Sequence, residues 1–300
     1  MNKRLLAIIA AIGATTIYGL NHTIAKGVMP HYVQPFGFII LRVLGAAILF
    51  WLISPWGPKE RIAQKDYLRM ILCAFLGMGM NMLVFFKGLS LTTPINSSVL
   101  VTTTPIIVLI LSAIILKERI TRRKILGIGI GLLGALGLIL LGKEIRSDAS
   151  NIPLGNFLIL LNSIFYGSYL VLVKSLIIKY HPFTFMKWLF TLGILICLPF
   201  GYDEFMQIRW STLPLEAFWG IAFVILGTTF CTYLFNIFAL KQLKASTLSA
   251  FVYVQPLIGI GYAIFTGQDH LTLVKVIAAC LVLAGVYLAS KKRKWKLIEE

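Results

Sequence analysis

The stretch TTTPIIVLILSAIILKERIT, residues Thr102–Thr121, is a long apolar run with one internal proline and a charged end. The same pattern returns 151 residues further on as YVQPLIGIGYAIFTGQDHLT, residues Tyr253–Thr272, and Pro105 then corresponds to Pro256. A pattern this unusual, written twice at one spacing, indicates that the chain is built from two related halves.

The composition places these halves in a membrane. The chain has 300 residues, of which 58% are hydrophobic and 13% charged, and its mean hydropathy is +0.88. A water-soluble domain could not cover so much apolar surface, whereas a helix needs roughly 20 mainly apolar residues to cross a bilayer. Charged and Pro/Gly-rich breaks divide the chain into ten such segments, expected near 5–25, 34–54, 69–89, 94–116, 123–142, 153–175, 182–200, 215–239, 245–266 and 273–290.

Five helices in each half is an odd number, so the second half enters the membrane from the opposite side. The predicted fold is therefore an all-α membrane protein with ten transmembrane helices in two inverted five-helix repeats. The predicted organisation is a first repeat over 1–142, a linker loop over 143–152, a second repeat over 153–290 and a basic tail over 291–300.

The net charge of +17 does not indicate nucleic-acid binding, because Lys and Arg form short clusters between apolar runs and no continuous basic face. Cytoplasmic loops of membrane proteins carry an excess of these residues. If both termini are cytoplasmic, the clusters around Lys59, Arg122 and Lys291 all lie on the inner side. The pattern thus predicts a multi-pass protein with its N and C termini in the cytoplasm.

Pro105 and Pro256 are expected near the middle of their helices. Proline removes one backbone hydrogen bond, which lipid tolerates only where neighbours or a hydrated cavity satisfy the freed carbonyl. Interrupted helices at matching places in two halves point to a substrate site in transporters. We therefore predict that the two prolines act as hinges beside such a site; kinks without a binding role are the alternative.

Polar residues gather on the helices around these breaks. Buried polar groups in lipid face inward and find partners, so they predict a polar, largely uncharged cavity. For a single Ser or Thr, as at Thr104 or Thr228, hydrogen bonding within or between helices is the favoured role. The predicted substrate-binding residues, apart from Arg42, are Tyr18, Asn21, His22, Asn81, Ser98, Tyr166, Tyr169, Tyr233, Asn236, Tyr253 and Gln255.

Arg42 also belongs to the predicted substrate-binding set. It lies some eight residues into the second helix, on the order of 12 Å from the membrane edge. A cation at that depth is costly unless it meets carbonyls or an anion. Two roles are open: Arg42 attracts a substrate carboxylate or phosphate, or it pins a helix.

All eleven acidic residues fall in loops, helix ends or the tail. The sequence therefore lacks a mid-membrane carboxylate for sodium or proton coupling, and only His22 leaves proton coupling open. It also lacks a P-loop and an HExxH motif. No catalytic residue, metal or cofactor is expected.

Together, these features resemble the EamA family of the drug/metabolite transporter superfamily. The residues that carry the resemblance are Tyr18, Gly19 and Asn21 in the first helix, Arg42 in the second, and a proline-broken fourth helix that closes in Leu116–Thr121. The family usually has Trp at Tyr18 and Tyr166 and Glu at Asp269. The resemblance implies a bacterial inner-membrane exporter of amino acids or related metabolites that works by alternating access.

The resemblance also implies that the fifth and tenth helices lie apart from the central cavity. Their small residues predict scaffold or dimer packing, so the protein is expected as a monomer or a homodimer. Two other functions stay open. One is a nucleotide-sugar or phosphate-ester antiporter of the same superfamily, and the other is a membrane-embedded enzyme or lipid-handling protein.

Overall fold

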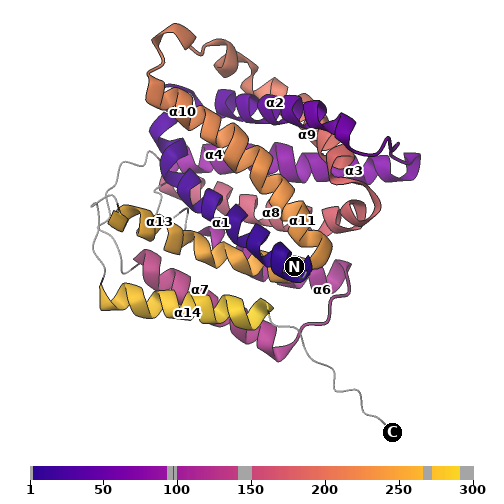
Figure 1. The fold of residues 1–300 in the computed structure, drawn as a ribbon. Helices are drawn as coiled ribbons and strands as arrows, with labels where there is room; N and C mark the ends of the chain where they lie inside the picture. The colour runs from indigo at the N-terminus through magenta and orange to yellow at the C-terminus, as the bar shows by residue number, and fades with distance from the viewer. Residues whose placement is uncertain (1–2, 93–96, 98–99, 141–150, 266–271, 291–300) are drawn as a thin grey trace.

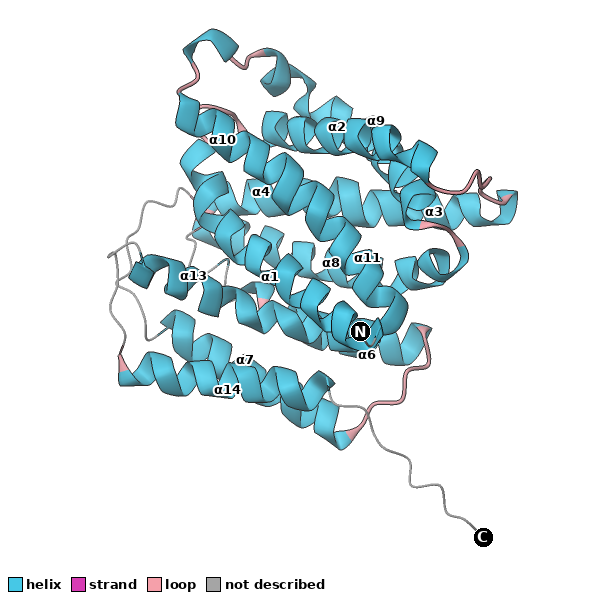
Figure 2. Ribbon diagram, in the orientation of Figure 1, coloured by secondary structure: helices cyan, strands magenta, loops and turns pink. Residues whose placement is uncertain are grey.

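A computed structural model describes residues 3–92, 97, 100–140, 151–265 and 272–290 of the protein. The side chains of residues 22, 23, 26, 138–140, 260 and 263 are also outside this description. The regular structure of the described residues is helical throughout (Figure 2). It forms ten passes in chain order, as predicted. Seven helical segments of the described chain are long and apolar enough to cross a membrane.

The first repeat contributes five passes, coloured indigo to magenta in Figure 1. Its third pass consists of α3, η3 and α4, which follow one another without a gap. Its fourth pass begins with helical residues 97, 100 and 101. The bounds are α1 (Lys3–Val28), α2 (Pro35–Ile53), η1 (Ser54–Trp56), η2 (Gln64–Asp66), α3 (Tyr67–Ala74), η3 (Phe75–Met80), α4 (Asn81–Leu91), α6 (Thr104–Ile115) and α7 (Arg122–Leu140).

The second repeat also has five passes. Its first two helices have favourable N-termini: the Asn151 side chain accepts from the backbone N–H of Leu154 at 3.2 Å, and each helix has a proline at its first or second position. The bounds are α8 (Ile152–Lys179), α9 (Pro182–Met206), η4 (Trp210–Thr212), α10 (Leu215–Phe223), η5 (Val224–Cys231), α11 (Thr232–Gln242), α12 (Ala245–Leu248), η6 (Ser249–Val254), α13 (Gln255–Phe265) and α14 (Leu273–Ser290).

Most of the contacts between helices join one repeat to the other, and they occur in matching pairs. Helix α2 packs on α9, and α7 packs on α14, so equivalent passes of the two repeats meet directly. The pairing of α4 with α8 has its counterpart in α1 with α11, and that of α6 with α8 in α1 with α13. This contact pattern confirms the predicted duplication.

Helices α7 and α14 lie side by side at one edge of the molecule (Figure 1). Their glycines allow close approach: a Cβ on Gly134 would lie 2.7 Å from the Val282 nitrogen, and one on Gly285 would lie 2.4 Å from the Gly131 nitrogen. The small residues predicted for scaffold or dimer packing are thus used within the chain, between these two helices.

Two π-helical segments interrupt equivalent passes. Segment η3 lies in the third pass and η5 in the eighth, at corresponding places of the two repeats. A π-turn makes room for one extra residue in a helix and is frequent at functional sites. Here η3 packs against α8 and α9, and η5 packs against α1 and α2.

The prolines lie where their passes change form. Pro105 and Pro256 fall near the middle of the fourth and ninth passes, as expected, and each is the second residue of an α-helical segment, α6 or α13. A turn at residues 102–103 precedes α6, and the 3₁₀ segment η6 precedes α13. Proline is well tolerated in a first turn, where no N–H donor is needed. The proline inside a long helix is Pro199, because α9 continues to Met206 instead of ending near residue 200.

Candidate functional site

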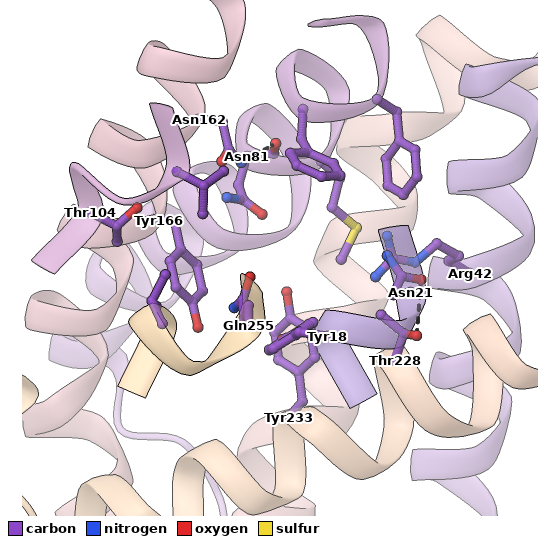
Figure 3. Close-up of a pocket in the computed structure, with 15 residues that line it drawn as sticks. Tyr18, Asn21, Arg42, Asn81, Thr104, Asn162, Tyr166, Thr228, Tyr233 and Gln255 are labelled. Carbon is purple, nitrogen blue, oxygen red and sulfur yellow. Dashed lines mark hydrogen bonds between the residues drawn. The ribbon is translucent and has the colours of Figure 1, made fainter. Parts of the chain in front are cut away.

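A cavity opens at the centre of the bundle, between the two repeats. It holds about 700 Å³ of space that no atom fills, counting space continuous with the solvent. Both repeats line it, as Figure 3 shows. The lining residues are Tyr18, Asn21, Arg42, Asn81, Met82, Phe85, Phe86, Val101 and Thr104 from the first repeat, and Asn162, Tyr166, Thr228, Tyr233, Val252 and Gln255 from the second.

Arg42 is held from two sides. Its Nε donates to the Thr229 hydroxyl at 3.0 Å, and its guanidinium carbon lies 5.0 Å from the centre of the Phe86 ring. Thr229 in turn donates to the Val224 carbonyl at 2.7 Å, a bond that spans the π-turn of η5. The irregular helix therefore presents the hydroxyl that orients Arg42.

Two pairs of polar side chains continue the lining. The Thr228 hydroxyl donates to the Asn21 amide oxygen at 3.0 Å, a bond drawn in Figure 3. The Asn162 amide nitrogen donates to the backbone carbonyl of Asn81 at 3.0 Å. Each pair joins the two repeats, and all four side chains are buried. The lining is thus held in place by hydrogen bonds across the interface between the repeats.

Three tyrosines form the wall opposite these amides. The hydroxyl of Tyr233 donates to the Gly77 carbonyl in η3 at 3.3 Å. The hydroxyl of Tyr18 lies within hydrogen-bonding reach of Tyr166. In Figure 3 the rings of these residues surround Gln255, whose amide points into the cavity. The wall offers phenol and amide groups, which can donate and accept hydrogen bonds without a net charge.

Seven of the predicted residues line the cavity together: Tyr18, Asn21, Arg42, Asn81, Tyr166, Tyr233 and Gln255. Their role in binding stays a prediction. Ser98 lies outside the described residues, and so does the side chain of His22. Three further predicted residues lie behind the lining and not in it.

Tyr169 and Tyr253 are packed residues. The Tyr169 ring covers Gly77, where a Cβ would lie 2.4 Å from it, and the ring centre is 6.4 Å from that of Tyr233. The Tyr253 ring covers Gly131 of α7 in the same way, at 2.6 Å. Asn236 lies beside the Tyr18 hydroxyl, one layer behind the cavity. Glycines on the facing helices make room for both rings. The sequence around each tyrosine gives no sign of this packing.

Eight lining residues were missed as substrate contacts. Met82, Phe85, Phe86, Val101 and Val252 are apolar and carry no signal in a chain that is apolar nearly throughout. Thr104, Asn162 and Thr228 are polar, and the repeat provides a usable signal for Thr104, which corresponds to Gln255 at the 151-residue spacing. Thr228 lies in η5 and bonds to Asn21.

Glu118, the acidic residue of the opening motif, lies in a second buried cluster. It accepts from the backbone N–H of Ala245 at 3.2 Å and from the Ser246 hydroxyl. Lys124 lies 3.5 Å from the same carboxylate and donates to Ser246 at 2.6 Å. Glu118 thus joins the end of the fourth pass to the start of α12 in the other repeat. Asp269 lies outside the described residues.

Comparison with known proteins gives one family. A model described as the EamA-like transporter family matches residues 5–140 and 153–291. An uncharacterized transporter of Archaeoglobus fulgidus is 29% identical over 93% of this chain and 96% of its own length. The uncharacterized transporter YyaM of Bacillus subtilis is 26% identical over 96% and 94%.

A more distant relative and a solved structure agree with these matches. The WAT1-related protein At3g53210 of Arabidopsis thaliana is 21% identical over 96% of this chain and 86% of its own. A solved crystal structure superposes with a TM-score of 0.73 over 96% of both chains at 15% identity. At that identity the likeness concerns the fold.

Proposed function

Because the chain belongs to the EamA-like transporter family of membrane transporters, we propose that it exports a small polar metabolite, an amino acid or a related compound, by alternating access. The observation that carries this proposal is the central cavity, to which both repeats contribute. Family membership makes the chain a transporter and not an enzyme.

The cavity suits a small solute that must be released again. Amides and phenols supply hydrogen bonds to replace those with water, and the rings of Phe85 and Tyr166 offer apolar contact. Since the lining residues come from both repeats, a rocking motion of one repeat against the other would open the site to either side.

Contacts between the repeats at one end of the bundle support a cavity that is closed at that end. Glu118 with Ala245 and Ser246, and Asp66 with Lys179 and Tyr180, join the repeats at the end that we propose to be cytoplasmic. Alternating access requires such contacts to open and reform. We further propose a bacterial inner membrane, cytoplasmic termini and a monomer or homodimer.

A phosphate-ester or nucleotide-sugar substrate has less support. A phosphate monoester carries roughly two negative charges at neutral pH, and the described lining contains one cation, Arg42. Sites for such substrates need several cations. We therefore keep the uncharged or singly charged metabolite as the proposed cargo.

Transport is tested by counterflow in liposomes that contain the purified protein. A panel of amino acids and related metabolites is loaded inside, and entry of the labelled compound is followed with and without a pH gradient. Thr104→Trp fills the cavity from α6, whereas Ile110→Trp places the same ring on the exposed face of that helix. We expect counterflow by the wild type and by Ile110→Trp, and none by Thr104→Trp. Folded wild-type protein that exchanges no member of the panel would contradict the proposal.

A further inference from the structure

Arg42 is a buried cation without a counter-charge among the described residues. Arg42 is 5% exposed. The ion pairs among the described residues are those of Lys124 with Glu118 and Lys179 with Asp66, so Arg42 takes part in neither. Its hydrogen bond to a described residue uses Nε alone. Burial of a charge is unfavourable unless it finds a partner, so this arrangement needs an explanation.

The fold itself does not require a charge at this position. Helices α2 and α9 open with the same residues, Pro35-Phe36 and Pro182-Phe183, and seven residues after the proline the first repeat has Arg42 where the second has Leu189. Leu189 is fully buried. An apolar side chain therefore satisfies the packing at the equivalent place, and the cation serves something that only one repeat provides.

The contacts of Arg42 leave its outer nitrogens directed at the cavity. Nε is engaged by Thr229, and one face of the guanidinium rests against Phe86. Figure 3 shows the nitrogen atoms of Arg42 pointing toward Asn21 and the open space. A guanidinium fixed in this way presents a planar pair of donors, the geometry that matches a carboxylate.

On the premise of the transport function above, we propose that Arg42 binds the carboxylate of the substrate, and that the cargo is a small organic molecule carrying one carboxylate, with an amino group dispensable. The described lining contains no acidic side chain that would pair with an ammonium group. Its remaining groups are amides, hydroxyls, phenols and apolar side chains. One cation balances one carboxylate and leaves a phosphate monoester with excess charge.

The test separates the carboxylate from the rest of the molecule. Each of several amino acids, aromatic and branched aliphatic, is compared with its deaminated acid, its decarboxylated amine and its methyl ester. Binding to the purified protein is measured by the shift in thermal unfolding with compound concentration, and counterflow is measured in parallel. The proteins are wild type, Arg42→Lys, Arg42→Gln and the control Arg69→Gln, which removes an exposed Arg that contacts Ser175 on the same repeat-to-repeat surface.

We expect the amino acids and deaminated acids to bind, and the amines and esters to bind about tenfold or more weakly. Arg42→Gln is expected to lose the preference for acids, Arg42→Lys to keep part of it, and Arg69→Gln to keep all of it. The comparison of acid with amine on the wild type stands even if an Arg42 variant folds poorly. Inorganic phosphate and a phosphate monoester serve as further probes, and stronger binding of either than of the acids overturns the proposal.

The two proposals fail in different ways. Counterflow of amines or esters as fast as of acids refutes the role of Arg42 and leaves transport standing. Carboxylate binding that depends on Arg42, without counterflow of any compound, supports the site and refutes the transport proposal. Failure of every carboxylate to bind the wild type refutes the carboxylate site.

Discussion

Gln255 and Tyr253 lie two residues apart, yet their side chains have different surroundings. Gln255 opens α13 and lines the cavity, whereas the ring of Tyr253 packs on Gly131 and is fully buried. The Tyr253 hydroxyl has no hydrogen-bond partner among the described residues. The difference arises because residues two apart point to nearly opposite faces of a helix and so meet different neighbours.

This difference predicts opposite results for two conservative changes. Gln255→Leu should weaken substrate exchange about tenfold, because a hydrogen-bonding group of the site is lost while the shape is kept. Tyr253→Phe should leave exchange unchanged and stabilise the protein by about 1 kcal/mol, because it removes a buried hydroxyl without a partner. Counterflow and thermal unfolding measure the two effects. Loss of exchange in Tyr253→Phe would show that the Tyr253 hydroxyl takes part in substrate binding.

At the scale of elements, the breaks in the helices are what create the site. The π-turns of η3 and η5 free the groups that hold Tyr233 and Arg42, namely the Gly77 carbonyl and the Thr229 hydroxyl. The interruption before α6 places Val101 and Thr104 at the cavity. A set of uninterrupted α-helices would satisfy its own backbone groups and leave fewer of them for side chains.

Glu118, which joins α12 to the first repeat, is expected to contribute to the stability of the protein. Glu118→Ala removes the acceptor for the Ala245 N–H and leaves Lys124 without its ion pair in a buried place. Loss of one member of a buried pair costs about 3 kcal/mol or more, so we expect a clear fall in stability, measured by thermal unfolding in detergent.

The matched control is Lys179→Ala, which breaks the more exposed pair with Asp66 at the same end of the bundle. Exposed pairs contribute little because water screens them, and the expected change is much smaller. Glu118→Gln should fall between the two, since an amide keeps an acceptor for the Ala245 N–H without the charge. Equal stability of Glu118→Ala and the wild type would show that this cluster does not hold the repeats together.

At the scale of the whole molecule, the duplicated halves determine how the chain crosses the membrane. Each half has five passes, and its equivalent helices pack together as α2 with α9 and α7 with α14. Because five is an odd number, we expect residues 143–152 and the tail over 291–300 on opposite faces of the bilayer. The Lys- and Arg-rich loops predict that the tail is on the cytoplasmic face.

Labelling tests this arrangement. Single cysteines are introduced as Asp148→Cys and Lys296→Cys in a background that lacks the four native cysteines, and an impermeant thiol reagent is applied to cells. We expect Asp148→Cys to react in intact cells and Lys296→Cys only after permeabilisation. Reaction of both from the same face would exclude the inverted arrangement of the repeats.

What the sequence by itself determined about this protein is its class and its plan. Apolar length predicts ten passes, repetition predicts two halves, and polar residues near Pro105 and Pro256 indicate the region of the site. These properties depend on short segments and on the bilayer. The cavity wall was decided only by the tertiary structure, because it depends on which helices meet and on where each helix breaks. Tyr253 therefore faces a glycine of α7, and apolar Phe86 supports Arg42. Contacts between helices that are distant in the sequence, and not local pattern, determine the direction of each side chain.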